Sequence, residues 1–355
     1  MQKKTKLILV VLLPIQILVL QLLKYVPEFI ETFYSTGIFP FISKTSRFIF
    51  GWIPFSVGDI FYFFIIVFLI RWVYKNIKRI KTDTKNFILD IFSTLSVVYL
   101  LFNLLWGLNY YRVPLHQSLT LDTEYNTEEL IATTKRLIKK SNEMHRQLGF
   151  HDSIKIKSPY DDKQLFEKTL NGYKNLSQKY PNLDYTPLSL KNSIWSLGLT
   201  YMGYSGYFNP FTGEAQVNSL INFHKFPVVS CHEQAHQLGY AAENEANFIA
   251  ALATINNEDE FIKYTGYIFA LRYCVNEIAR RDLDTYHELL TTISPGILKS
   301  YKEMRDFWKS YENPFEVISK LFWDQFLKAN NQSNGIKSYS YMVALIINYY
   351  EDQPF

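Results

Sequence analysis

Three long apolar runs dominate the first third of the chain. They cover residues 7–23, 53–73 and 87–108, and each reaches about 20 residues, which is enough for a helix to cross a bilayer. Buried core helices are the alternative, but three such runs close together disfavour it. The pattern therefore predicts a membrane domain at residues 1–109 and a second domain of ordinary polarity at residues 110–355.

The first run has two interpretations. It follows Lys3, Lys4 and Lys6, as the apolar region of a signal peptide follows its basic segment. No small-residue cleavage site comes after it, because the chain continues with the polar and bulky residues of segment 24–28. An uncleaved transmembrane helix is therefore the preferred interpretation.

Basic residues gather on one side of the expected spans. The N-terminal tail is basic, and so is the loop between the second and third runs. That loop contains Arg71, Lys75, Lys78, Arg79, Lys81 and Lys85. Cytoplasmic loops carry the excess of Lys and Arg, so three crossings place residues 110–355 outside the cytoplasm. Trp106, Tyr110 and Tyr111 are expected to form an interfacial aromatic belt at the outer end of the third span.

The second domain is predicted to be mainly α-helical with a small β element. The stretch 183–209 is rich in Ser, Gly and Tyr, which indicates loops or short strands. Residues 214–220 alternate between apolar and polar and predict a strand. Helices are expected at 127–148, 161–179, 228–238, 243–255, 258–280, 283–291, 296–309, 313–329 and 337–350.

Composition adds two limits. The formal net charge of +4 is small, and no basic stripe interleaved with aromatic residues occurs in the polar part, so nucleic-acid binding is not indicated. The two cysteines, Cys231 and Cys274, both fall in the exported part. An oxidising compartment permits a disulfide between them, and two buried small side chains are the alternative.

The strongest chemical signal is the H-E-x-x-H segment from His232 to His236. Side chains four apart on a helix share one face, so His232 and His236 can hold one Zn²⁺. Glu233 then lies close enough to act as the catalytic base on a metal-bound water. An amphipathic helix that carries these polar residues by accident is the alternative. The motif predicts a zinc metallopeptidase, which is a hydrolase.

The third ligand of such a site has two candidates, Glu243 and Glu245. On a straight helix Glu243 would lie about 10.5 Å beyond His236 along the axis, too far for one ion. The chain must therefore turn after the motif, and Gly239 permits a turn there. For either Glu, the alternative role is a favourable charge at a helix N-terminus.

The segment from Glu243 to Asn247 resembles the E-x-x-A-D signature of membrane-bound gluzincins. The resemblance implies Glu243 as the third ligand and Asn247 as an uncharged replacement for the Asp that orients a ligand in that family. Position 242, where metzincins place a third His or Asp, is Ala. In zincins an edge strand lies above the metal helix and binds the substrate backbone, and strand 214–220 is expected to take that place.

The chain as a whole resembles an uncharacterised family of bacterial inner-membrane proteins, a domain of unknown function with a predicted metallopeptidase motif. The resemblance covers nearly the full length. Besides the three spans, it depends on segments 54–59, 106–112, 209–215 and 232–248. It implies a multi-pass protein of the bacterial inner membrane with the fold and topology given above, and it implies no particular substrate.

The expected function is thus a membrane-anchored zinc-dependent metallopeptidase. Its partners would be the lipid bilayer and a peptide or protein substrate outside the cytoplasm. Intramembrane proteolysis is disfavoured by Lys225, Gln234, Gln237 and Glu243, which make the motif region too polar for lipid. A non-catalytic zinc-binding membrane sensor or assembly protein remains an alternative, although a structural site has no need of Glu233.

We also expect a side chain that donates a hydrogen bond to the oxyanion of the tetrahedral intermediate, and the sequence does not decide among several candidates. The candidates are His224, Tyr204, Tyr207, Arg272, Tyr339 and Tyr341. Of these, His224 is expected to be an ordinary surface or loop residue.

Overall fold

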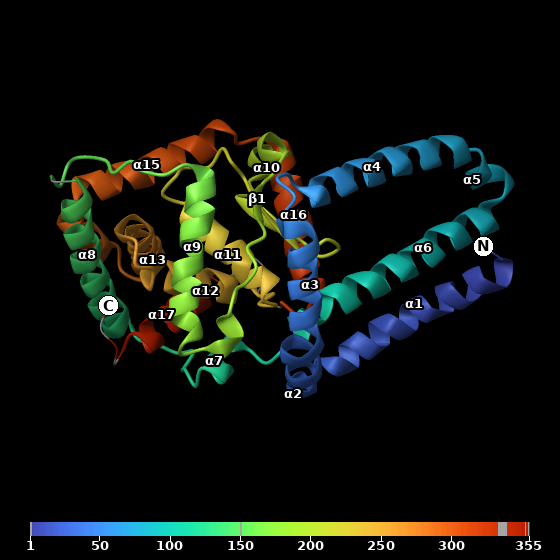
Figure 1. The fold of residues 1–355 in the computed structure, drawn as a ribbon, viewed down its shortest axis with the longest axis horizontal. Coiled ribbons are helices and arrows are strands. Elements are labelled where there is room, and N and C mark those ends of the chain that lie inside the picture. The colour runs from blue at the N-terminus through green and yellow to red at the C-terminus, as the bar shows by residue number, and fades with distance from the viewer. Residues whose placement is uncertain (1, 150, 333–338, 352, 354) are drawn as a thin grey trace.

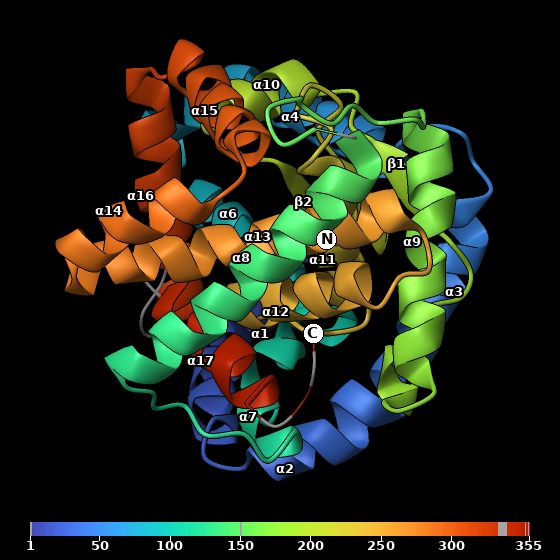
Figure 2. The same cartoon turned by 90° about the vertical axis from the view of Figure 1, so that its left-hand side faces the viewer.

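The computed structural model describes residues 2–149, 151–332, 339–351, 353 and 355. It is mainly helical with one small sheet, as predicted. Three long helices extend to one side of a helical body that contains the sheet (Figure 1). Viewed from the end opposite these helices, α12 (Glu243–Ile255) and α13 (Glu260–Arg281) lie at the centre of the body (Figure 2).

The three long helices are α1 (Lys3–Leu23), α4 (Val57–Asn76) and α6 (Thr84–Leu105). Each is long and apolar enough to cross a membrane, which confirms three long apolar helices at the positions of the expected spans. α1 and α6 lie side by side, and the Gln16 amide donates to Ser96 Oγ at 3.1 Å between them. α4 continues through the short α5 (Arg79–Thr82) into α6.

The segment between the first two spans is also helical, which the sequence did not predict. It forms α2 (Pro27–Ile30), the π-helix η1 (Glu31–Ile38) and α3 (Phe39–Gly51). Arg47 of α3 donates to the Pro187 carbonyl at 3.3 Å, so this segment packs on the body. The expected domain boundary at residue 109 stays a prediction.

The helices of the body agree with the predicted ranges to within a few residues. The exceptions are four short helices, at 107–111, 115–118, 181–183 and 196–202, which were not predicted; the last of them forms inside the stretch expected to be loop or strand. The expected residues 337 and 338 lie outside the described part of the chain. The remaining helices are η2 (Gly107–Tyr111), α7 (Leu115–Ser118), α8 (Thr127–Gly149), α9 (Asp162–Ser177), η3 (Pro181–Leu183), α10 (Ser196–Met202), α11 (Phe226–Gln237), α14 (Leu283–Thr292), α15 (Pro295–Ser310), α16 (Pro314–Ala329) and α17 (Tyr339–Tyr349).

Helix α12 is buried on nearly all sides because small residues let its neighbours approach. Ala246, Ala250 and Ala253 are at most 1% exposed, and α9, α11, α13 and α17 all contact the helix. Gly172 of α9 lies so close that a Cβ there would be 1.8 Å from the Ala253 carbonyl oxygen. This packing fixes the N-terminus of α12 beside α11.

The sheet has the order β1–β3–β2, from β1 (Leu190–Asn192), β2 (Gly206–Asn209) and β3 (Glu214–Val217). β3 is parallel to β1, with Leu190 opposite Ala215, and antiparallel to β2, with Gly206 opposite Val217. The strand expected at 214–220 is therefore confirmed at residues 214–217, but its expected edge position is wrong because strands pair on both sides of it. Both edge strands contact α11, and β2 does so more extensively than β1.

Candidate metal centre

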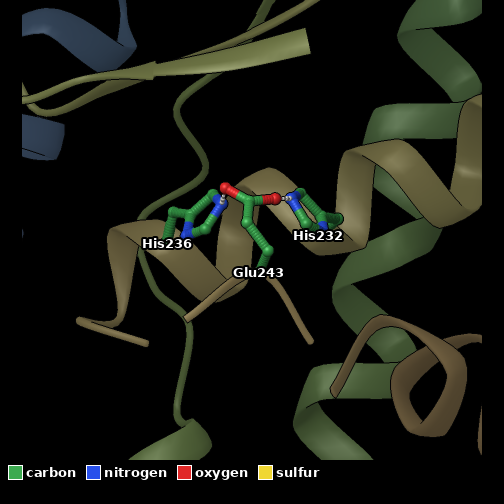
Figure 3. A group of neighbouring side chains, drawn as sticks. All are labelled: His232, His236 and Glu243. Carbon is green, nitrogen blue, oxygen red and sulfur yellow. Dashed lines mark ion pairs between the residues drawn. The ribbon is translucent and has the colours of Figure 1, made fainter. Parts of the chain in front are cut away.

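The two histidines of the motif lie one turn apart on one face of α11. Their ring centroids are 4.6 Å apart. Gly239, with φ of +89°, follows the end of the helix, and its N–H donates to the His236 carbonyl at 3.0 Å. The chain reverses at this turn, and α12 begins at Glu243. The expected Gly-assisted turn therefore exists, and it brings Glu243 back to the histidines (Figure 3).

Glu243 lies between the two imidazoles. Its carboxylate oxygens are 3.3 Å from Nε2 of His232 and 3.6 Å from Nε2 of His236, and one donor atom from each residue can be chosen so that all lie within 4.8 Å of one another. Atoms about 2.0–2.1 Å from a tetrahedral zinc lie roughly 3.3 Å from each other. Two nitrogens and a carboxylate at this spacing therefore fit a zinc ion with a fourth position left open.

The ring of His236 is oriented by the turn that follows it. Its Nδ1 lies 2.7 Å from the Tyr240 carbonyl. A carbonyl only accepts, so Nδ1 carries the proton and Nε2 presents a lone pair toward Glu243. Burial and the nearby charge of His232 lower the pKa of His236 to about 4, which keeps the imidazole neutral and able to ligate.

His232 and Glu243 stabilise each other's charged forms. Burial alone would lower the pKa of His232, but the hydrogen bond and charge of Glu243 outweigh it and raise the pKa. Burial would likewise raise the pKa of Glu243, and the two histidines lower it. Nδ1 of His232 has no hydrogen-bond partner among the described residues. Asn247 lies beside this ring, and its expected orienting role stays a prediction.

Glu245 points to a different place. It is 4% exposed, and its Oε1 accepts from the backbone N–H of Leu115 at 2.7 Å. The charge of Arg112 also acts on it. Of the two glutamates weighed as the third ligand, the structure brings only Glu243 to the histidines.

Glu233 lines a cavity together with His232 and Glu243, and it is 3% exposed. Burial, the largest effect, raises the pKa of its carboxyl to about 8. Its Oε2 has no hydrogen-bond partner in the described part of the chain. Gly206 of β2 lies against the other carboxylate oxygen, since a Cβ built there would be 2.7 Å from Glu233 Oε1. Once ionised, this carboxyl, held beside three potential metal ligands, is placed to accept and return a proton.

A cavity of about 330 Å³ opens in front of His232, Glu233 and Glu243, while His236 lies behind its lining. α11 and α12 form its floor, the start of β2 forms one wall, and α13 and α16 form the others. The lining residues are Gly203, Tyr204, Ser205, Gly206, Lys225, Val228, Val229, His232, Glu233, Glu243, Asn244, Asn247, Phe269, Tyr273, Lys320, Trp323 and Leu327.

Comparison with known proteins places the chain in a family. A family model described as "Protein of unknown function (DUF3810)" matches residues 34–347. The chain belongs to the DUF3810 family. No curated protein and no solved structure matches it. The match begins within η1 and ends within α17, so it includes two of the three spans and every residue of the cluster. The resemblance to a family of unknown function is thus confirmed, and its metallopeptidase part stays a prediction.

In this DUF3810 member, the segment after the third span packs against α11 and supports the metal centre. Trp106 Nε1 donates to the His236 carbonyl at 3.1 Å, and the Trp106 ring packs on Phe208 of β2 at 5.0 Å between centroids. Trp106, Tyr110 and Tyr111 are only 6%, 3% and 3% exposed. The expectation that they form an interfacial belt is therefore wrong, because the body covers them.

Most of the candidate oxyanion donors lie away from the cluster or are already engaged. Tyr207 bonds to Asp59, and Tyr341 lies against His116. His224 is in a turn, as expected of a loop residue, but it is buried and bonds to Ser300 rather than lying at the surface. The side chain of Tyr339 lies outside the described part of the structure.

Two candidates remain near the cluster. Tyr204 lines the cavity, although its hydroxyl donates to the Ser319 carbonyl at 3.1 Å. Arg272 lines an adjoining cavity that shares Lys225, Phe269 and Tyr273 with the first. Tyr273, which the sequence did not single out, therefore lines both cavities.

Cys231 and Cys274 are both free thiols, and both are buried. The disulfide alternative is therefore wrong for this structure, and the alternative of two small buried side chains holds. Burial raises the pKa of both thiols, to about 12 for Cys274, so neither is available as a thiolate at neutral pH.

Proposed function

We propose that this protein is a membrane-anchored zinc metallopeptidase. The observation that carries the proposal is the convergence of His232, His236 and Glu243 at zinc-ligand spacing. Beside them, Glu233 lines a cavity with His232 and Glu243, and its Oε2 has no hydrogen-bond partner among the described residues. A structural zinc site is closed by four protein ligands and has no use for such a base. The set of three ligands plus a base is the pattern of a catalytic site.

Zinc and Glu233 have separate roles in the proposed reaction. When bound, Zn²⁺ supplies Lewis acidity that activates a water and polarises the scissile carbonyl. Glu233 accepts one proton from the water as the water oxygen attacks the carbonyl carbon. Glu233 then returns that proton to the leaving nitrogen as the C–N bond breaks. One water is added across one peptide bond, which gives a carboxyl group and an amine.

Strand β2 offers a place for the substrate backbone. Among the described strands it pairs only with β3, and Gly206 at its start lies against Glu233. An extended peptide that adds to this edge would pass in front of the base. The absence of a side chain at Gly206 leaves room for the carboxylate and for a close approach of the backbone.

The orientation of the spans decides from which side of the membrane a substrate would reach the site. The basic loop between α4 and α6 favours a cytoplasmic location for that end of the spans. The metal cluster belongs to the body, at the opposite end of the spans from this loop (Figure 1). We therefore place the cluster on the non-cytoplasmic side of a bacterial inner membrane. α11 has 12 residues and is not among the helices long and apolar enough to span a membrane, which argues against intramembrane proteolysis.

The test compares the full-length wild type with Glu233→Gln in detergent. Zinc content is measured by mass spectrometry, and hydrolysis is followed with a library of quenched fluorescent peptides. We expect one zinc per chain in both proteins and a loss of activity of about 10²–10⁴-fold in the variant, the range for removal of a general base. Equal behaviour of the two proteins, with zinc retained, would instead mean a non-catalytic zinc protein.

A further inference from the structure

Two cations line the cavities at and next to the centre. Lys225 bonds to Ser205 Oγ and lies 5.1 Å from the centre of the Trp308 ring. Arg272 donates to the sulfur of Met304 at 3.0 Å. Within the described chain, neither forms an ion pair with a carboxylate at 4 Å or less. A half-buried cation is costly unless it is paired, so these two charges favour binding of an anion that the described residues do not provide.

The cations lie at the junction of two cavities. Lys225 lines both the cavity of the metal cluster and the adjoining one of about 270 Å³, which also contains Arg272. Burial chiefly, and then the charges of Arg272 and Lys320, lower the pKa of Lys225 to about 7. Lys320 itself is paired with Glu316. Lys225 and Lys320 therefore line one end of the metal cavity, and Arg272 lies near Lys225 in the adjoining cavity.

This end of the cavity lies along the direction that a substrate would follow. Lys225, Val229, His232 and His236 are spaced by four, three and four residues, so they form one stripe on α11. Lys225 precedes His232 by seven residues, or about 10.5 Å along the axis. That length corresponds to about three residues of extended peptide, and the reach of the lysine side chain shortens it.

Strand polarity decides which end of a peptide meets the cations. The side chain of Lys225 bonds to Ser205, which directly precedes β2. A peptide added antiparallel to β2 runs from Asn209 toward Gly206, so its C-terminal end points to Ser205 and Lys225. Antiparallel addition also continues the pairing that β2 makes with β3.

From this arrangement we infer that the carboxylate at the C-terminus of the substrate binds to Lys225 and Arg272. The inference rests on the proposed metallopeptidase function and narrows its substrate class. The enzyme then removes short fragments, about one to three residues long by the spacing above, from the carboxyl ends of peptides. Charge-assisted hydrogen bonds from ammonium and guanidinium groups would hold the terminal carboxylate.

The first experiment compares matched peptides with the zinc-loaded full-length protein. One peptide has a free C-terminal carboxylate, the second is amidated, and the third is amidated with Glu as its last residue. We expect kcat/KM for the free acid to exceed that for the plain amide by about tenfold or more, the effect of one charged hydrogen bond, and the fragments released to be one to three residues long. A Glu-ending amide that matches the free acid would show that an acidic side chain is recognised instead, which overturns the inference.

Variants of Lys225 then test whether this lysine binds the terminal carboxylate. Lys225→Met should reduce the preference for the free acid to less than about twofold, and Lys225→Arg should restore it. Lys302→Met is the matched control, because the Lys302 side chain is 70% exposed on α15 and should leave the preference unchanged. A preference that survives in Lys225→Met contradicts the assignment to this lysine.

A binding measurement separates this inference from the proposed function. In zinc-loaded Glu233→Gln, fluorescence anisotropy is used to compare a labelled tripeptide acid with its amide. Tighter binding of the acid by about tenfold, abolished by adding Lys225→Met, supports the carboxylate subsite even if the wild type hydrolyses nothing. Equal binding of acid and amide overturns the subsite, and it does so even if the wild type is an active peptidase.

Discussion

Glu243 and Glu245 show how two neighbouring carboxylates acquire different environments. Both lie in the first turn of α12, where the helix dipole favours a negative charge on either. Two positions apart on a helix corresponds to about 200° of rotation, so their side chains leave opposite faces. Glu243 faces α11 and the histidines, whereas Glu245 faces Leu115 and Arg112. The sequence alone could not decide between them because it does not fix how α12 is rotated against α11.

This difference gives a paired prediction for zinc binding. Glu243→Ala removes a carboxylate between the histidines and should weaken zinc affinity by more than the 10–100-fold that loss of an outer partner typically costs. Glu245→Gln keeps an acceptor for the Leu115 N–H, so it should retain zinc and lose about 1 kcal/mol of stability. Zinc affinity is measured by competition with a chromogenic chelator. Loss of zinc in Glu245→Gln but not in Glu243→Ala would show that Glu245, and not Glu243, is the third ligand.

His224 gives a prediction for acid stability. Burial first, and then the charges of Lys155 and His145, lower its pKa to about 3. The unfolded chain, with an ordinary histidine pKa near 6.5, therefore binds more protons than the folded chain between about pH 3 and 6.5. Stability should rise with pH through this window and fall as the solution is acidified, by at most a few kcal/mol from this residue, since one pKa unit corresponds to about 1.4 kcal/mol.

The measurement is the free energy of urea unfolding of the full-length protein at pH 4.5 and pH 6.5. His224→Gln should reduce the difference between the two values. His287→Gln, at an exposed position on α14, is the matched control and should leave the difference as in the wild type. An unchanged difference in His224→Gln would show that acid sensitivity comes from other groups.

At the scale of elements, the turn between α11 and α12 decides whether the cluster forms. Gly239 has φ of +89°, and a Cβ there would lie 2.9 Å from both Phe39 Cδ1 and Asn109 Oδ1. Gly239→Ala should therefore cost about 2 kcal/mol or more, from left-handed strain and overlap together. Because the turn carries Glu243, zinc affinity should fall as well as the melting temperature.

Gly198→Ala is the control for this prediction. Gly198 lies in α10, and no atom is within 4 Å of a Cβ built there. Alanine has the higher helix propensity, so this change should be neutral or stabilise by up to about 1 kcal/mol. Equal melting temperatures and zinc affinities for the two variants would mean that the turn does not position Glu243.

The elements that the sequence predicted correctly are those with a strong periodic pattern. α12 was predicted at its observed bounds, 243–255, and the three spans within a few residues. α10 was missed because Ser196, Gly198 and Gly203 make its segment look like a loop. The edge position of strand 214–217 was wrong because β1, its parallel partner, is only three residues long and leaves little pattern.

On the scale of the whole molecule, the membrane-spanning part and the body are joined at the sheet. Glu214 of β3 is fully buried, pairs with Lys191 at 2.6 Å and accepts from the backbone N–H of Val57 at 3.2 Å at the start of α4. Asp59 of α4 accepts from the Ile194 N–H at 2.7 Å. Two stretches that carried the family resemblance, 54–59 and 209–215, therefore meet at this junction.

The candidate site depends on this junction and on segments that the sequence assigned to the membrane part. Arg112 binds Glu31 at 2.7 Å and the Gly239 carbonyl at 3.0 Å, so η1 supports the turn that carries Glu243. Trp106 supports α11 in the same way. Periodicity predicts which segments are helical, but it does not show which distant segments pack together, so these supports could not be found from the sequence.

The most direct test of the account is the rate of peptide hydrolysis by wild type and Glu233→Gln at equal zinc content. We expect one zinc per chain in both proteins. Hydrolysis by the wild type should be lost on chelation and return with added zinc, and it should fall about 100-fold or more in the variant. Equal rates in the two proteins, or no zinc bound by the wild type, would contradict the account.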